Sequence, residues 1–319
     1  MPLLSVRDLK TYFHVHMGTV KSVDGVSFDL EPGKTLGIVG ESGSGKTVSC
    51  LSLVKLVPMP PGEIVSGQAL LEGIDLLTLS EKELRKVRGR KISMIFQEPM
   101  TALNPLFTVG EQIAETIRLH QKLNKAEAFE KAVEMLSSVS IPLPQVRAKS
   151  YPHQMSGGMK QRAMIALAMS CRPRILIADE PSTALDVTVQ AQILLLIHEF
   201  KKKYGTSVIL VTHNMGVITA TADEVMVMYV GKMVEKGDIY EVFNNPRHPY
   251  TQGLLECILK SSGGKNALKT MSGFIPNPIN KPKGCAFNPR CSQRKDICLV
   301  EEPPVLQTGG HETACWLYA

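Results

Sequence analysis

The stretch that most constrains the fold of this chain is GESGSGKT, at Gly40–Thr47. An apolar run, Thr35–Gly40 (TLGIVG), comes before it, and an apolar helical stretch, Val48–Val57 (VSCLSLVKLV), comes after it. The order strand, glycine-rich loop, helix, with the spacing G-x-x-x-x-G-K-[ST], is typical of a phosphate-binding loop. Its backbone N–H groups and the N-terminus of the following helix attract an anion. The sequence therefore predicts an α/β fold with a nucleotide phosphate site at the end of a buried strand.

Side chains of this loop have distinct tasks in such a site. We expect Lys46 to reach the β- and γ-phosphates of a nucleotide and the Thr47 hydroxyl to bind Mg²⁺. The other loop positions expected to hold the phosphates are Gly40, Ser42, Gly43, Ser44 and Gly45. A GTPase would also carry an Asn-Lys-x-Asp motif, and the nearest match, Asn280–Lys283 (NKPK), lacks the aspartate. The loop alone does not separate kinases from transport ATPases.

Two further apolar runs read as buried strands and end in polar residues. Ile175–Asp179 (ILIAD) leads into Glu180, and Ser207–Thr212 (SVILVT) leads into His213. Such continuous β-branched runs, separated by helices, indicate a mainly parallel sheet covered on both faces. Asp179 suits a Mg²⁺ contact, and Glu180 can polarise an attacking water. Acidic strand ends also serve as helix caps and a lone histidine is often structural, but their order after the phosphate loop favours catalysis.

A second anion-binding pattern lies between these strands, in MSGGMKQR at Met155–Arg162. Ser156, Gly157 and Gly158 open a helix, so they offer bare N–H groups and a helix N-terminus to an anion. The chain already has one complete phosphate loop. A second site makes most sense if it serves a nucleotide held by another subunit.

These segments, in this order, resemble the ATP-binding cassette (ABC) ATPases. SGGMKQR is similar to the family signature, with Met159 where many members have glutamine. Gln97, in IFQEP, matches the Q-loop, and Ser182–Asp186 (STALD) matches the D-loop. His213 matches the switch histidine of the family. The matching segments lie between about residue 1 and residue 243.

The resemblance implies a dimer of cassettes with two ATP molecules at the interface. Each ATP is held by the phosphate loop of one subunit and by Ser156–Gly158 of the other. It further implies that Gln97 senses Mg²⁺ and the attacking water and that His213 contacts the γ-phosphate. The catalytic residues implied are therefore Glu180, His213 and Gln97, with Thr47, Gln97 and Asp179 around Mg²⁺.

The family places an aromatic side chain upstream of the phosphate loop against the adenine ring. Phe13 matches that position best, and Tyr12 is the alternative. A packing role in the core is open for either residue.

The region after the Q-loop is expected to form a helical subdomain, at about residues 100–165. Leu103–Ser150 reads as mainly helical, and Pro142 and Pro144 end its last long helix before the signature. Within Ala126–Val139, helical spacing places four apolar residues on one face: Phe129, Ala132, Val133 and Leu136. In transporters of the family this subdomain receives a helix from the membrane subunit. The resemblance implies a cassette over 1–243, with a mostly parallel sheet flanked by helices and a small antiparallel part. A small, loop-rich extension that contains four cysteines is expected over 244–319.

Alternative classes fit less well. Chromosome-organising ABC ATPases need a long heptad coiled coil between Lys46 and Asp179, where about 130 residues show no sustained heptad. The net charge of +6 does not indicate the strongly basic face that nucleic-acid binders usually show. The N-terminus shows no secretory signal, and the longest aliphatic runs, such as Ile193–Ile197 (ILLLI), are too short to span a bilayer.

Three segments resemble, more narrowly, the D-type ATPase subunits of dipeptide and oligopeptide importers. They are Arg247–Glu256 (RHPYTQGLLE), Gln97–Pro105 (QEPMTALNP) and the signature with methionine. This resemblance implies a heterodimer with an F-type ATPase, two membrane permease subunits and an external peptide-binding protein. It also implies a peripheral location on the cytoplasmic face of the membrane. A nickel importer of the same family is the alternative.

Four of the seven cysteines lie near the end of the chain, at Cys285, Cys291, Cys298 and Cys315. Their spacing lacks the C-x₂-C pairs of zinc ribbons. Four thiolates fit either a [4Fe–4S] cluster or a Zn²⁺ site. Disulfides or free thiols are a further option, which a reducing compartment disfavours.

The resemblance to D-type subunits favours the iron–sulfur cluster, with a structural or sensing role. An oxidised cluster with four thiolates carries about −2 overall. Five nearby cations offset that charge: Lys281, Lys283, Arg290, Arg294 and Lys295. The remaining cysteines, Cys50, Cys171 and Cys257, are expected to be packing residues.

Overall fold

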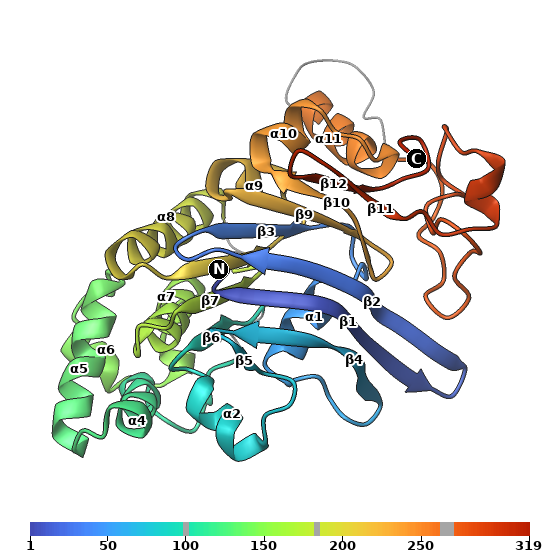
Figure 1. The fold of residues 1–319 in the computed structure, drawn as a ribbon. Helices are drawn as coiled ribbons and strands as arrows, with labels where there is room; N and C mark the ends of the chain where they lie inside the picture. The colour runs from blue at the N-terminus through green and yellow to red at the C-terminus, as the bar shows by residue number, and fades with distance from the viewer. Residues whose placement is uncertain (98–101, 182–185, 262–270) are drawn as a thin grey trace. The chain divides into compact units, whose positions relative to one another are not determined.

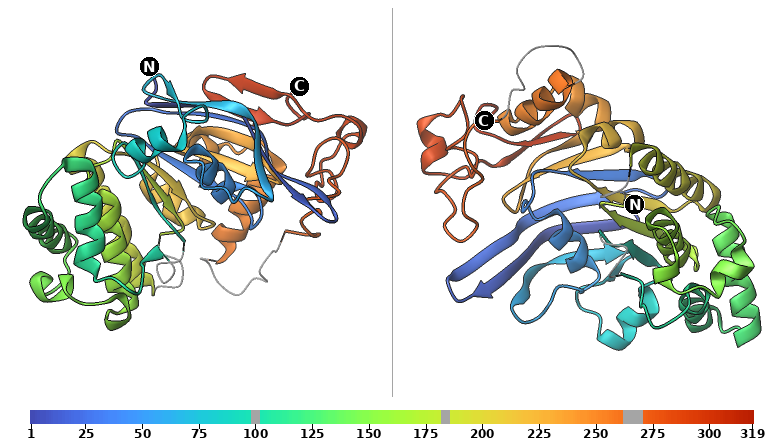
Figure 2. Two further views of the ribbon diagram at one scale, coloured as in Figure 1. Left: turned by 90° about the horizontal axis from the view of Figure 1, so that it is seen from below. Right: turned by 180° about the vertical axis from the view of Figure 1, so that it is seen from behind.

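The computed structural model describes residues 1–97, 102–181, 186–261 and 271–319 (Figures 1 and 2). Two compact units make up the chain. The first unit contains Met1–Thr78 and Leu210–Ala319, and the second contains Leu79–Ile209. β8 (Ser207–Val211) carries the chain from the second unit back into the first.

An antiparallel sheet opens the first unit, with the strand order β2-β1-β4-β5. Its strands are β1 (Leu4–Val15), β2 (Gly18–Leu30), β4 (Gly62–Leu71) and β5 (Ile74–Asp75). Leu4, Val6 and Leu9 of β1 are fully buried, and β1 and β2 are joined by a tight turn before Gly18. Figure 1 shows β1, β2 and β4 side by side. This sheet is the small antiparallel part expected of the fold.

The phosphate loop follows a strand of a second sheet in the same unit. β3 (Thr35–Val39) is parallel to β9 (Glu224–Tyr229), which pairs with β10 (Lys232–Asp238). All five residues of β3 are buried, as its continuous apolar sequence requires. The sheet continues through β12 (His311–Ala314) to β11 (Val305–Thr308), a terminal hairpin that the sequence analysis did not predict. The end of the chain is therefore part of the sheet that carries the phosphate loop.

Helices of the first unit are short. They are α1 (Lys46–Leu53), α9 (Met215–Thr221), α10 (Ile239–Asn244), α11 (Pro249–Ser261) and the 3₁₀ turn η2 (Asp296–Leu299). α9 lies against β3, where a side chain at Gly37 would come within 2.8 Å of Ile218.

The second unit is mainly helical around a parallel pair of strands. β6 (Ile92–Ile95) is parallel to β7 (Ile175–Asp179). The helices are α2 (Glu81–Val87), α4 (Val109–Gln121), α5 (Lys125–Ser138), α6 (Pro144–Ala148), α7 (Gly157–Met169) and α8 (Val187–Tyr204), with the 3₁₀ turn η1 (Pro152–Gln154). The predicted helical content of Leu103–Ser150 is confirmed by α4, α5 and α6.

Side-chain capping defines the helix starts in this unit. Thr108 begins α4 and Asn124 begins α5, each in a reciprocal capping box with a glutamate three residues later. On α5, Ala132 and Leu136 are buried as predicted, and Ala128 is buried with them. Phe129 and Val133 are only half-buried, since the buried stripe follows the i, i+4 spacing through Ala132.

The expected α/β fold with parallel strand pairs is therefore confirmed. The boundary between residues 243 and 244 stays a prediction, because the chain after it lies in the same compact unit as β1–β5. Among the described residues, every helix falls short of the length and apolarity needed to cross a membrane.

Candidate functional site

Close backbone packing shapes the phosphate loop. Gly45 precedes α1 with φ 100, and a side chain there would lie 2.2 Å from the carbonyl oxygen of Ser22. Gly40, with φ 152, is equally close to the carbonyl oxygen of Met228. The N–H of Gly231 donates to the Ser44 carbonyl over 2.9 Å. Only glycine fits the first two positions, so the loop is held tightly against β2 and the β9–β10 turn.

Lys46 lies across its own loop. Its ammonium group donates to the carbonyl oxygens of Gly40 and Glu41, over 2.8 and 3.0 Å, and to the Ser44 hydroxyl over 3.4 Å. The side chain is buried, so this cation is held inside the ring of the loop. That position suits the predicted role, since phosphate oxygens would replace the carbonyl oxygens as its partners.

The other predicted residues of the first unit differ in their exposure. Ser42 and Gly43 are exposed at the loop tip, and Thr47 is half-buried in the first turn of α1. His213 is exposed directly after β8, where Asn214 caps α9. Their predicted contacts with ATP stay predictions.

Tyr12 and Phe13 differ in their surroundings. The Tyr12 hydroxyl donates to Asp24 over 2.8 Å, and the Lys21 ammonium lies 5.4 Å from the centre of its ring. Burial, followed by that hydrogen bond, raises the pKa of Tyr12 to about 12. Phe13 has no polar group and is half-buried near Gly62. Because the Tyr12 side chain is already bound to Asp24, Phe13 is the favoured candidate for stacking on the adenine ring.

The second unit brings two predicted catalytic residues together. The Gln97 side-chain amide donates to the Glu180 carboxylate over 3.1 Å. Glu180 has φ 45, a left-handed conformation that is costly for a residue with a side chain. Asp179 is buried at the end of β7, as predicted for a group near Mg²⁺. Strain of this kind is common where a side chain must be aimed at a reacting group.

The signature segment begins α7 as predicted. The Ser156 side chain accepts from the Met159 N–H over 3.4 Å, and Ser156 and Gly157 are exposed, with Gly158 half-buried. The Gln161 side-chain amide donates to the Pro181 carbonyl, which ties this helix to the segment after Glu180. The D-loop prediction falls on residues 182–185, outside the described residues, while Asp186 caps α8.

The extension contacts the phosphate loop, which the sequence analysis missed. The two terminal nitrogens of Arg290 bind the Glu41 carboxylate at 2.6 and 3.0 Å. The Tyr250 hydroxyl accepts from the Glu41 N–H over 2.8 Å. The hydrogen bond to Glu41 is the main reason that the pKa of Arg290 lies above its ordinary value. Tyr250 lies within Arg247–Glu256, the segment that resembles the importer ATPases, so that segment was the available sequence signal for this contact.

A buried polar network fixes this part of the extension. Glu235 is fully buried and accepts from the N–H groups of Arg247 and His248 over 2.7 and 2.9 Å. His311 of β12 lies 2.7 Å from the same carboxylate. The His248 ring accepts from the Tyr250 N–H over 3.0 Å, and burial lowers the pKa of His248 to about 3. The network therefore ties the start of α11 to β10 and β12.

The four cysteines near the C-terminus lie close to one another. All four are free thiols, with Cys298 and Cys315 buried and Cys285 and Cys291 half-buried. Burial, together with smaller effects of the other three cysteines, raises the pKa of Cys285 to about 11. Yet among the described residues, no group of three or more Cys, His, Asp or Glu side chains is arranged to hold a metal ion. The structure therefore leaves the predicted [4Fe–4S] cluster, and its Zn²⁺ alternative, without direct support.

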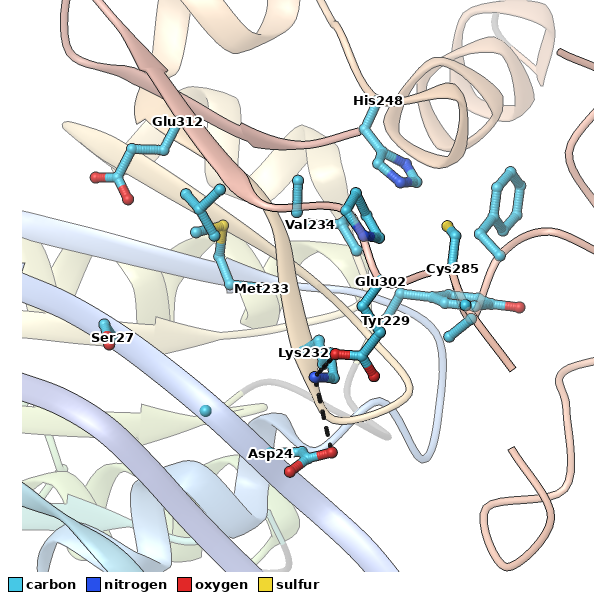
Figure 3. Close-up of a pocket in the computed structure, with 17 residues that line it drawn as sticks. Asp24, Ser27, Tyr229, Lys232, Met233, Val234, His248, Cys285, Glu302 and Glu312 are labelled. Atoms are coloured by element: carbon cyan, nitrogen blue, oxygen red, sulfur yellow. Dashed lines mark hydrogen bonds and ion pairs between the residues drawn. The ribbon is translucent and has the colours of Figure 1, made fainter. Parts of the chain in front are cut away.

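A cavity of ≈ 290 Å³ lies beside Cys285 (Figure 3). Tyr229, Val234 and Phe287 contribute apolar surface to its lining. Lys232 forms an ion pair with Glu302 at 2.6 Å and a longer one with Asp24 at 3.8 Å, as the dashed lines in Figure 3 mark. The cavity adjoins the cysteines and not the tip of the phosphate loop.

Comparison with known proteins agrees with this geometry. The family model described as ABC transporter matches residues 23–183. The chain belongs to the ABC transporter family. It is accordingly an ABC ATPase, which confirms the resemblance drawn from the phosphate loop and the signature. A second model, described as the oligopeptide/dipeptide transporter C-terminal region, matches residues 234–298.

Relatives of this ABC ATPase align over nearly its whole length. The oligopeptide transport ATP-binding protein OppD of Bacillus subtilis is 49% identical over 317 residues, covering 99% of this chain and 88% of the relative. AppD of the same organism, also named an oligopeptide transport ATP-binding protein, is 46% identical and covers 99% and 97%. OppD of Haemophilus influenzae is 46% identical and covers 100% and 98%.

Solved structures show the same fold. The ATP-binding cassette MJ0796, in a dimeric state bound to ADP and Pi, is 24% identical with a TM-score of 0.67, covering 74% of this chain and 98% of that chain. CbiO1 of Clostridium perfringens, part of the ABC transporter complex cbiONQ, is 25% identical with a TM-score of 0.63, covering 76% and 91%. The cassette architecture expected from the sequence is therefore confirmed.

Proposed function

We propose that this ABC ATPase powers the import of di- or oligopeptides through a membrane transporter. The observation that carries the proposal is the pair of matches on one chain, the cassette over 23–183 and the oligopeptide/dipeptide transporter C-terminal region over 234–298. The relatives named as oligopeptide transport ATP-binding proteins align with both parts together. Chromosome maintenance has no comparable support.

In the proposed reaction, the phosphate loop holds the ATP and Glu180 activates water. Lys46 binds the β- and γ-phosphates, and Thr47 and Asp179 hold Mg²⁺. Glu180 accepts a proton from the water that attacks the γ-phosphate. Gln97 orients the Glu180 carboxylate through the hydrogen bond of 3.1 Å. His213 contacts the γ-phosphate, and Phe13 stacks on the adenine.

A second cassette would complete the site. Ser156 and Gly157 are exposed at the N-terminus of α7, in position to reach a phosphate on another chain. We propose that Ser156, Gly157 and Gly158 bind the ATP of a partner ATPase, the F-type subunit of a heterodimer. The loop containing Lys46 would in turn receive the corresponding segment of that partner.

The helical region is the proposed contact with the membrane subunits. Leu106 and Phe107 are 78% and 53% exposed at the entrance to α4, and Leu119 is 66% exposed on the same helix. These apolar side chains lie downstream of Gln97, so a helix docked on them would be linked to the ATP site. The ATPase would then sit at the cytoplasmic face of the membrane, bound to two permease subunits and served by an external peptide-binding protein.

A direct test uses this subunit assembled with its permease and ATPase partners in liposomes. We expect ATP hydrolysis to rise when an oligopeptide and its binding protein are supplied, with uptake of labelled peptide. Uptake of Ni²⁺ without peptide uptake would instead support the nickel alternative. Failure of both with an intact assembly would reject import by this complex.

We further propose that Cys285, Cys291, Cys298 and Cys315 ligate a [4Fe–4S] cluster. Their grouping at one place in the fold supports this, because four thiolates complete such a cluster. When bound, the cluster would crosslink the loops of the extension. Protein purified without oxygen should be brown, absorb near ~400 nm and contain about four iron atoms. A colourless protein with one Zn²⁺ would identify a zinc site instead.

A further inference from the structure

Glu41 of the phosphate loop is held by a side chain from the far end of the chain. Arg290 approaches the Glu41 carboxylate with both terminal nitrogens, at 2.6 and 3.0 Å. The Arg290 side chain is 3% exposed and that of Glu41 is 26% exposed. A bidentate arginine–carboxylate pair that is shielded from water is strong and directional.

Arg290 is itself fixed in place. Its Nε donates to the Ser272 carbonyl over 3.2 Å. Its guanidinium lies 5.8 Å from the ring centres of both Tyr229 and Phe287. These contacts therefore help to hold the guanidinium in place independently of its ion pair with Glu41.

A second contact from the extension reaches residues that pack against the loop. The Lys281 ammonium donates to the carbonyl oxygens of Lys21 and Val230, over 2.8 and 2.9 Å. The next residue, Gly231, donates its N–H to the Ser44 carbonyl of the loop over 2.9 Å. The extension thus supports the loop at two places.

Glu41 would disfavour phosphate binding at this loop if its charge were not paired with Arg290. It is a carboxylate inside a loop whose backbone is built to bind an anion, so an unpaired charge there would repel the phosphates of ATP. We propose that Arg290 is a positioning residue for ATP binding, which neutralises the Glu41 carboxylate and holds it away from the phosphates. This inference rests on the proposed role of the phosphate loop.

The test measures Mg·ATP binding to the purified full chain by fluorescence titration, together with the melting temperature without nucleotide. We expect Arg290→Gln to raise the Kd about tenfold, which corresponds to ~1.4 kcal/mol. Adding Glu41→Gln to that variant should recover most of the affinity, because the repelling charge is gone.

Arg7→Gln is the matched control. Arg7 also pairs with a carboxylate, Asp29, at 2.7 Å, but that pair is exposed on β1 and β2. We expect its Kd to be unchanged. The penalty in Arg290→Gln should shrink as salt increases, since screening weakens charge repulsion.

Several results would overturn the inference. They are an unchanged Kd in Arg290→Gln, or no recovery on adding Glu41→Gln to that variant. If Arg290→Gln does not fold, Arg290→Lys carries the test: the ammonium keeps the charge but loses the bidentate pair, so we expect a loss of affinity smaller than tenfold. An unchanged Kd in Arg290→Lys, or a loss of tenfold or more, would overturn the inference. Lys46→Ala separates this question from the loop assignment: normal binding in that variant would reject the phosphate loop itself.

Discussion

The Gln97 amide donates to the Glu180 carboxylate over 3.1 Å, although 83 residues separate the two positions in the chain. The bond orients the carboxylate proposed to accept a proton from water. The bond occupies only one side of that carboxylate, so other groups can bind it as well. A shift of Gln97 would therefore change the orientation of this carboxylate.

Glu180→Gln should retain ATP binding and lose turnover. Glutamine keeps the shape of the side chain but accepts no proton, so we expect the rate of hydrolysis to fall by at least ~10²-fold. Phosphate release by the assembled ATPase measures turnover, and nucleotide titration measures binding. Normal hydrolysis in this variant would remove Glu180 from the mechanism.

Gln97→Ala tests the orienting bond. We expect a smaller loss of turnover than in Glu180→Gln, because the carboxylate remains but is no longer held. The double variant should be no worse than Glu180→Gln alone, since both residues act through one group. Fully additive losses would show that Gln97 acts independently of Glu180.

Lys46→Ala should lose nucleotide binding while keeping the fold. ATP stabilises a protein that binds it only in the native state, by an amount that follows the ligand concentration relative to Kd. We therefore expect the rise in melting temperature on adding Mg·ATP to disappear in this variant. A similar rise in the variant and the wild type would contradict the assigned role of Lys46.

Ser156→Arg should damage the site of the partner subunit. The substitution puts bulk and charge at the exposed start of α7, so the variant chain should still bind ATP on its own phosphate loop. Hydrolysis should fall in the assembled pair of ATPases. Loss of ATP binding by the isolated variant chain would argue against a site shared between subunits.

The buried His248 predicts a dependence of stability on pH. Burial lowers its pKa to about 3, whereas in the unfolded chain the ordinary value is 6.5. Between these values the unfolded state binds more protons, so the free energy of unfolding should fall as pH drops below about 6.5, by up to ~1.4 kcal/mol per pH unit.

Urea unfolding between pH 7 and 5 measures that slope. His248→Asn preserves a hydrogen-bond acceptor but does not titrate, so its slope should be flatter in this window. His14→Asn is the control, because His14 is exposed on β1. Equal slopes in the wild type and His248→Asn would assign the effect to other groups.

The buried strands of the fold could be predicted from short stretches of the sequence. β7 has the predicted limits, and β3 and β8 each end one residue earlier than expected. Continuous apolar runs followed by loop residues leave few other conformations. The start of α7 after Ser156 was predicted in the same way.

The hairpin of β11 and β12 was missed although its signal is present. Two four-residue strands flank Gly309-Gly310, a pair that favours a tight hairpin turn. The prolines of the extension had favoured the prediction that this segment is loop-rich. The contact of Arg290 with Glu41 had no local signal, since 249 residues separate the two. The pairing of β10 with β12 and the contact of Tyr250 in α11 with Glu41 hold the extension beside the loop.

That pairing has a consequence for synthesis of the chain. The phosphate loop leaves the ribosome roughly 250 residues before Arg290, and the strand that covers the edge of β10 consists of His311–Ala314. Until His311–Ala314 emerge, a nascent chain presents an open row of backbone donors and acceptors at the edge of β10. A chain truncated before His311 should therefore aggregate more readily than one that contains β12.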